Sequence, residues 1–162
     1  MLAWLGYRRT LTRREHKVNA AVLRELAANN DHSIFLTSSI TGLASSTKEY
    51  SVSIASGGGS RHAIIEIGKN GGNYFAMKYA VNLATGAITQ NSNDGTAQVT
   101  QSAVATLDPD GFWRVVIRIT YDATMPNNPF LFIRMCDNPA TLNNNYVGDD
   151  TSTIKVWGFD VK

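Results

Sequence analysis

The chain has 162 residues, a length that fits one domain and buries roughly 68–70% of the surface of the unfolded chain. Its single cysteine excludes an internal disulfide, and its apolar stretches are far shorter than the ~20 residues of a membrane-spanning helix. The net charge of +2 is divided unevenly, because residues 1–30 carry six basic and two acidic residues, whereas residues 31–162 carry nine basic and eleven acidic ones. This asymmetry predicts a basic arm, residues 1–31, and a slightly acidic body, residues 32–162.

The arm contains a predicted helix over residues 12–29. Thr12 is a candidate N-cap, and Glu15 three positions later completes a capping box. An apolar stripe at helical spacing comprises Val18, Ala21, Val22 and Leu26. A helix of this length is marginal alone in water. The helix therefore needs a surface on which to pack its apolar stripe. That surface could belong to its own body, to a second copy of the chain or to another protein.

The arm is expected to attach the chain to other proteins. Tryptophan, tyrosine and arginine dominate the anchors of protein interfaces. The candidate attachment residues are Trp4, Tyr7, Arg8, Arg9, Arg13 and Arg14. Clustered arginines also suit nucleic acid, but the apolar stripe and the acidic body disfavour that partner. The apolar start precedes the basic residues, the reverse of a secretory signal, so neither ordinary export nor a membrane partner is expected.

The body follows a period of two, which predicts an all-β protein. About nine short strands are separated by turn residues, and no second helical pattern occurs, which indicates an antiparallel sandwich or jelly roll. The predicted strands are Ser33–Ile40, Lys48–Ala55, Arg61–Ile67, Tyr74–Val81, Ala87–Gln90, Ala97–Thr100, Phe112–Tyr121, Phe130–Cys136 and Thr153–Val161.

Three segments carry a family resemblance. The last of them is a Tyr-Val-Gly-Asp-Asp turn, residues 146–150, followed by a C-terminal strand that contains Trp157-Gly158. The other two are the predicted hairpin Asn82–Ile88 and the strand start Asp110–Val116. In this order they resemble the carbohydrate-binding-module-like jelly-roll domains of tailed-bacteriophage tail fibres and other virion surface proteins, over residues 33–162. Such domains carry a strand before the segment matched by Ser33–Ile40. A helix in its place would leave a sheet edge open to pairing or covering.

The resemblance implies a jelly roll that binds glycan. Sugars stack on flat aromatic faces flanked by polar side chains. The candidate glycan-binding residues are Tyr74, Tyr79, Tyr121, Arg134 and Tyr146, of which Tyr146 is expected to be the most exposed. Trp113, Phe132 and Trp157 are expected in the core.

Metal and catalytic sites are weakly indicated. The jelly rolls that the chain resembles often hold a structural calcium ion near their last strands, and Asp149, Asp150 and Asp160 could be its ligands. Alternatively, Asp149 and Asp150 cap a turn and Asp160 is a polar surface residue. The three histidines lack zinc-ligand spacing, and no nucleophile motif occurs. Glycan cleavage needs two carboxyl groups across a cleft. The candidate pairs are Asp108/Asp110, Asp149/Asp150 and Glu49/Glu66. We expect no enzyme activity and no other cofactor.

These patterns favour a non-enzymatic surface protein of a phage or phage-like virion, a tail-fibre, spike or decoration component made in the host cytoplasm. The arm would bind other virion proteins. The sandwich would face outward and bind host glycan during adhesion. The chain is expected to form a homo-oligomer, and the usual symmetry of phage fibres suggests a trimer. A soluble carbohydrate-binding module outside a virion and a sandwich without a ligand are the alternatives.

Overall fold

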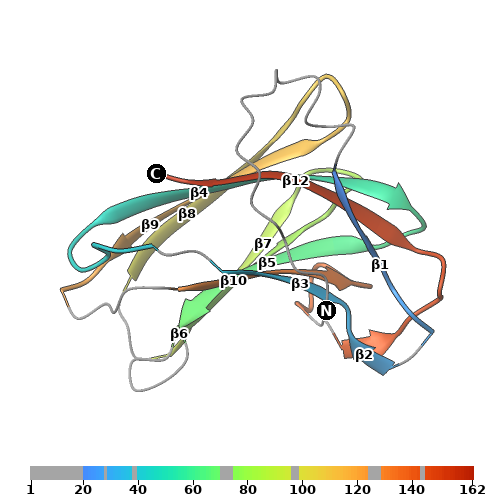
Figure 1. Cartoon of the computed structure of the whole chain (residues 1–162), viewed down its shortest axis with the longest axis horizontal. Coiled ribbons are helices and arrows are strands. Elements are labelled where there is room, and N and C mark those ends of the chain that lie inside the picture. Colours follow the sequence, from blue (N-terminus) through green and yellow to red (C-terminus); the bar gives the residue numbers. More distant parts are fainter. Residues whose placement is uncertain are drawn as a thin grey trace.

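The computed structural model describes residues 20–27, 29–37, 40–69, 75–95, 99–123, 129–142 and 145–162 (Figure 1). Within these residues all regular structure is β-strand, arranged as two five-stranded antiparallel sheets and a two-stranded ladder. Among them, no helix is long and apolar enough to cross a membrane.

The two large sheets form the body of the molecule. The first has the order β1-β12-β4-β9-β8, with bounds Ala21–Arg24, Thr153–Val161, Thr47–Gly58, Trp113–Tyr121 and Val99–Leu107. The second has the order β3-β10-β5-β6-β7, with bounds Ser33–Thr37, Phe130–Cys136, His62–Lys69, Phe75–Val81 and Ile88–Gly95. At one corner β2 (Asn29–Asp31) pairs with β11 (Asn145–Val147) (Figure 1).

The sheets pack face to face around one main core, which makes the fold sandwich-like. Strand alternation sends every second side chain inward. The buried residues include Tyr50, Val52 and Ile54 of β4, Ile65 and Ile67 of β5, Val115, Ile117 and Ile119 of β9, and Leu131, Ile133 and Met135 of β10. Full burial of one such aliphatic side chain stabilises the fold by about 1.5–3 kcal/mol. The central strands of both sheets therefore supply most of the apolar burial.

Each of the nine predicted strands overlaps an observed strand, and the bounds differ most for two of them. The prediction gave Ala87–Gln90 and Ala97–Thr100, whereas β7 runs from Ile88 to Gly95 and β8 from Val99 to Leu107. These segments are polar or rich in small residues and lack a clear alternation. Their pairing with β6 and β9 sets their extent, and only the sheet reveals that.

The predicted helix over residues 12–29 is wrong for its described part. Ala21–Arg24 is strand β1, paired with the last strand from Ala21↔Val156 to Arg24↔Thr153. Leu23 turns toward the core and Val22 toward solvent, a period of two that overrides the helical stripe. Residues 12–19 lie outside the described residues. β1 covers the edge of β12, so the arm segment Ala21–Arg24 occupies the sheet edge that was expected to be open to pairing or covering.

Side chains of the three resembling segments hold one another in place. Trp113 Nε1 donates a hydrogen bond to the Leu83 carbonyl at 2.9 Å, and its ring lies against Gly86. A Cβ at Gly86 would collide with that ring, and the φ of +74° also favours glycine. Arg114 Nη1 donates to the Gly158 carbonyl at 2.9 Å, where β12 bulges between Trp157 and Asp160. These residues therefore serve the fold.

Candidate functional site

Two predicted sugar-stacking tyrosines lie in the core, so the prediction is wrong for them. Tyr121 is buried and its hydroxyl lies 2.6 Å from that of Tyr50, whose pKa burial raises to about 12. Tyr79 is also buried, and its hydroxyl donates to Gln101 Oε1 at 2.5 Å. Burial likewise raises the pKa of Tyr79 and of Tyr121. Their alternation along β6 and β9 turns both rings inward, and Tyr74 lies outside the described residues.

Tyr146, predicted to be the most exposed candidate, is buried at the corner where β11 meets β2. Its hydroxyl donates to Glu25 Oε2 at 2.8 Å, and the Arg61 guanidinium lies 4.8 Å from its ring centroid. His32 packs against it with ring centroids 5.2 Å apart. Burial is the main cause that raises the pKa of Tyr146. The ring is therefore enclosed by protein, and the sugar-stacking prediction is wrong here too.

Glu25 is the centre of a polar network that we call the Glu25 cluster, made of Glu25, Arg61, Tyr146 and Asp149. The Glu25 side chain has no exposed surface. Arg61 binds it with two nitrogens, Nε at 2.8 Å and Nη2 at 3.0 Å, and the Asp149 backbone N–H donates to it at 2.7 Å. Hydrogen bonding to Glu25 raises the pKa of Arg61.

The cluster joins segments that are far apart in sequence. Glu25 follows β1, Arg61 lies between β4 and β5, Tyr146 is in β11 and Asp149 begins the turn into β12. A buried carboxylate is costly unless it is paired and hydrogen-bonded. Four donor groups around Glu25 meet that requirement, so the cluster fastens the first and last strands to both sheets.

The three aspartates of the predicted calcium site do not share one place. Asp149 lies in the turn before β12 and Asp160 lies near the end of β12, and at about 3.3 Å per residue the strand from Thr153 to Asp160 alone spans roughly 23 Å. Both Asp149 oxygens already accept hydrogen bonds, one from Thr151 and the other from the Ser152 hydroxyl. Hydrogen bonds from Ser152 hold the pKa of Asp149 well below its usual range. The structure therefore does not bring these three aspartates together, and within the described residues no group of three side chains suited to a metal ion was found.

The carboxylate pair Glu49/Glu66 is also separated. Glu49 lies on β4 between core positions and faces away from the other sheet, and Glu66 does the same on β5. The two carboxylates therefore lie on opposite outer faces, and they do not flank a common cleft. Cys136 is buried, and burial raises its thiol pKa to about 12, which agrees with a packing role.

An aromatic surface lies on the outer face of the second sheet, and we call it the Phe35 face: Phe35, Phe130, Phe132 and Arg134. Phe35 of β3 is directly opposite Phe132 of β10, and their ring centroids are 4.7 Å apart. Phe130 lies two residues along β10, with its centroid 5.3 Å from that of Phe132. Phe35 is 51% exposed, a large value for a phenylalanine in a paired strand. The sheet therefore presents aromatic surface to solvent.

Arg134 is fixed at the edge of these rings. Its guanidinium carbon lies 4.2 Å from the Phe132 centroid, a cation–π contact. Its Nε donates to Glu66 Oε2 at 2.7 Å, and Nη1 pairs with Asp31. Burial lowers the pKa of Arg134. Two carboxylates and one guanidinium thus border the aromatic rings.

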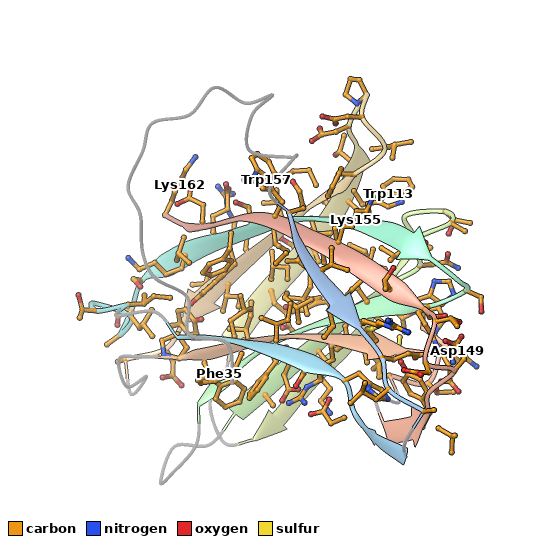
Figure 2. All side chains as sticks on the ribbon, turned by 45° about the vertical axis from the view of Figure 1, so that its right-hand side comes forward. Phe35, Trp113, Asp149, Lys155, Trp157 and Lys162 are labelled. Carbon is orange, nitrogen blue, oxygen red and sulfur yellow. The ribbon has the colours of Figure 1, made fainter. Side chains whose placement is uncertain are left out.

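Figure 2 separates the two regions in space. Phe35 lies on the second-sheet side, away from Trp157 and Lys155 on the first sheet, and Asp149 lies at the far end of the molecule. The Phe35 face and the Glu25 cluster are therefore distinct sites.

Sequence reasoning found only Arg134 of the Phe35 face, because it placed Phe132 in the core and passed over Phe35 and Phe130. The information was present in Phe130–Cys136, where aromatic and charged residues alternate with Leu131, Ile133 and Met135. Which set faces outward depends on the opposite sheet. The attachment residues Trp4, Tyr7, Arg8, Arg9, Arg13 and Arg14 lie outside the described residues.

No protein-family model matches the chain, and a search of curated proteins found no match.

Proposed function

We propose that the chain is a non-enzymatic binding module on the surface of a phage or phage-like particle, and that the Phe35 face binds host-surface glycan. The observation that carries the binding role is the half-exposed Phe35 ring, packed on Phe132 and bordered by Arg134 and two carboxylates. Fold alone assigns no ligand. The chemistry of this face is therefore the basis of the assignment.

Sugar rings present a C–H-rich face and a rim of hydroxyls. Phe35 and Phe132 offer apolar surface for the first, while Arg134, Glu66 and Asp31 offer donors and acceptors for the second. Because Arg134 is already held by Glu66, it loses little conformational freedom when a ligand binds. An open face suits weak binding, which repeated copies on a particle strengthen by about 10²–10⁴-fold.

A jelly roll is the fold that we propose for the sandwich, and the strand order supports it. In a jelly roll, the first strand pairs with the last in one sheet, and the second pairs with the penultimate long strand in the other. Here β1 pairs with β12 and β3 pairs with β10, while β4 and β5 lie on their other sides. In this assignment β7 and β8 are two added strands, one at the far edge of each sheet.

The particle location rests on the family resemblance of the three segments. The arm, with Trp4 and the paired arginines, attaches the module to other particle proteins. Deletion of residues 1–11 is expected to prevent incorporation into purified particles. Unchanged incorporation would contradict the attachment role and leave the glycan test unaffected.

The glycan role is tested with an array of bacterial surface glycans and three proteins: wild type, Phe35→Ala and Val147→Ala. Val147 is 68% exposed and lies on β11, not on the strands β3 and β10 that carry the aromatic rings, so it controls for loss of surface apolarity. The wild type and Val147→Ala are expected to bind the same glycans, and Phe35→Ala to lose about tenfold or more in affinity. Equal binding by Phe35→Ala, or no saturable binding by folded wild type, would contradict the proposal.

A further inference from the structure

Strand β8 is an edge strand that differs from the other three sheet edges. β1 and β3 are short, with four and five residues, and β7 pairs with β6 through a register shift. β8 has nine residues, Val99–Leu107, in unbroken register with β9. Its sequence, Val-Thr-Gln-Ser-Ala-Val-Ala-Thr-Leu, contains no charge and no proline. Short length, bulges, charges and proline are the usual protections of a sheet edge, and β8 has none of them.

The hydrogen-bonding direction of β8 follows from the hairpin that ends it. The Asp108 N–H donates to the Phe112 carbonyl at 2.8 Å, so position 108 faces β9. Backbone direction alternates along an antiparallel strand. Val104 and Thr106 therefore bond to β9, whereas the N–H and C=O groups of Ala103 and Ala105 point toward the free edge. Among the described residues, no strand pairs with β8 on that side.

Both faces of this edge carry apolar side chains, beside the polar Ser102 and Thr106 on the outer face. Ala103 and Ala105 pack at the margin of the core and are partly buried. Val104 on the outer face is 61% exposed, and Leu107 at the end of the strand is 55% exposed. A partner strand would cover all four side chains while satisfying the free backbone groups.

We propose that β8 pairs antiparallel with β8 of a second copy of this chain, about a two-fold axis through Val104. This register places Val104 against its counterpart, Ala103 against Ala105, and Ser102 against Thr106. Two alanines opposite each other extend the core across the junction without a clash. Because β8 carries no charge, the pairing brings no like charges face to face.

A two-fold interface uses the same patch on both subunits and closes as a dimer. The first sheets of the two subunits then form one continuous sheet. The Phe35 face lies on the outer side of the other sheet in each subunit, so both copies remain free to bind. The proposal does not depend on the glycan role.

The mass of the full chain in solution tests the pairing, by sedimentation at about 200 µM, where a dimer with micromolar Kd is populated. Wild type is expected at about twice its 17.7 kDa. Ala105→Pro removes an N–H that faces the free edge and leaves the β8–β9 ladder intact, so this variant is expected to be monomeric with an unchanged far-UV spectrum. Val104→Lys, which places two charges together at the axis, is expected to be monomeric too.

Val22→Lys is the matched control, because Val22 is a 59%-exposed valine at the opposite edge of the same sheet. It is expected to remain dimeric. Monomeric wild type at this concentration would overturn the proposal, and so would an oligomer that Val104→Lys leaves unchanged.

The register has its own test by disulfide trapping. In the proposed pairing, position 104 meets itself in a non-hydrogen-bonded pair, with Cβ atoms about 4.5–5.5 Å apart, close enough for a disulfide to form with small adjustments. Val104→Cys is expected to form a covalent dimer on mild oxidation, while Ser102→Cys, offset along the strand, stays monomeric under denaturing conditions. The native Cys136 is buried and does not compete. Trapping of Ser102→Cys without Val104→Cys would overturn the two-fold axis at Val104.

Discussion

The Glu25 cluster and the Phe35 face are each built around an arginine that pairs with two carboxylates, yet their surroundings differ. Arg61 pairs with Glu25 and Asp149, and the Glu25 carboxylate is enclosed by four donor groups from three other segments of the chain. Arg134 pairs with Glu66 and Asp31 but lies over Phe132, beside the half-exposed Phe35. Polar groups that satisfy one another stabilise the fold. At the Phe35 face, exposed aromatic rings lie beside the paired Arg134, so a ligand could contact the rings and the guanidinium together.

The largest expected effect is the loss of the arginine in the Glu25 cluster. Arg61→Met leaves Glu25 as an unpaired carboxylate with no exposed surface, and removal of one partner of a buried pair costs about 3–5 kcal/mol. The measurement is the free energy of unfolding in urea. The matched control is Arg118→Met, because Arg118 and Glu49 form an exposed pair at 4.0 Å, worth less than about 1 kcal/mol. Equal losses at the two positions would contradict the role of the cluster.

Removal of one donor to Glu25 is expected to have a smaller effect. Tyr146→Phe keeps the ring between Arg61 and His32 but removes the hydrogen bond to Glu25, which costs about 1–3 kcal/mol of unfolding free energy. Glycan binding is expected to be unchanged, because Tyr146 is enclosed. A stable Tyr146→Phe protein that no longer binds glycan would move the site to the corner of the sandwich.

Acid is expected to weaken the same cluster. The pKa of Asp149 is held below its ordinary value of 3.8 mainly by the Ser152 hydroxyl, so the folded state binds its proton less readily than the unfolded state. The resulting stabilisation is complete above about pH 4 and is lost as the pH falls through the folded-state pKa. Ser152→Ala is expected to raise the midpoint pH of acid unfolding, followed by circular dichroism. A midpoint that stays the same would contradict this account.

The smallest effect on stability is expected at the Phe35 face. Phe35→Ser exposes little new surface, because the ring is already half in solvent, and we expect unfolding free energy to fall by less than about 1 kcal/mol. The buried core position Ile133→Ser, on the neighbouring strand β10, is the contrast and is expected to unfold the domain at much lower urea. A large loss of stability at Phe35 would mean that the ring is structural.

The sequence was informative where local pattern and long-range pairing agree. Alternation in Trp113–Tyr121 and Phe130–Cys136 matched the observed strands, since both strands lie between neighbours. Residues 12–29 show why pattern alone is insufficient. Ala21, Val22 and Leu26 have helical spacing, but pairing with β12, which lies more than a hundred residues away in sequence, favours a strand. The same distance hid the Glu25 cluster.

The candidate site was harder to predict than the fold. The tyrosines were chosen because their side chains suit sugars, whereas exposure depends on which face of a strand meets the second sheet. Tyr79 and Tyr121 therefore lie in the core, while Phe132, which was expected in the core, and Phe35, for which no role was predicted, lie on the outer face. An aromatic residue at a strand position that alternates with aliphatic ones is the pattern that would have identified them.

The central claim, that the Phe35 face binds glycan while the Glu25 cluster holds the fold, is tested most directly by amide chemical-shift mapping. The ¹⁵N-labelled full chain is titrated with the tightest-binding oligosaccharide from the array. The account predicts that the largest shifts fall on β3, β10 and β5, around Phe35, Phe132 and Glu66, and that the amides of Glu25, Tyr146 and Asp149 stay in place. Saturable shifts centred on Tyr146 and Asp149 instead would contradict it.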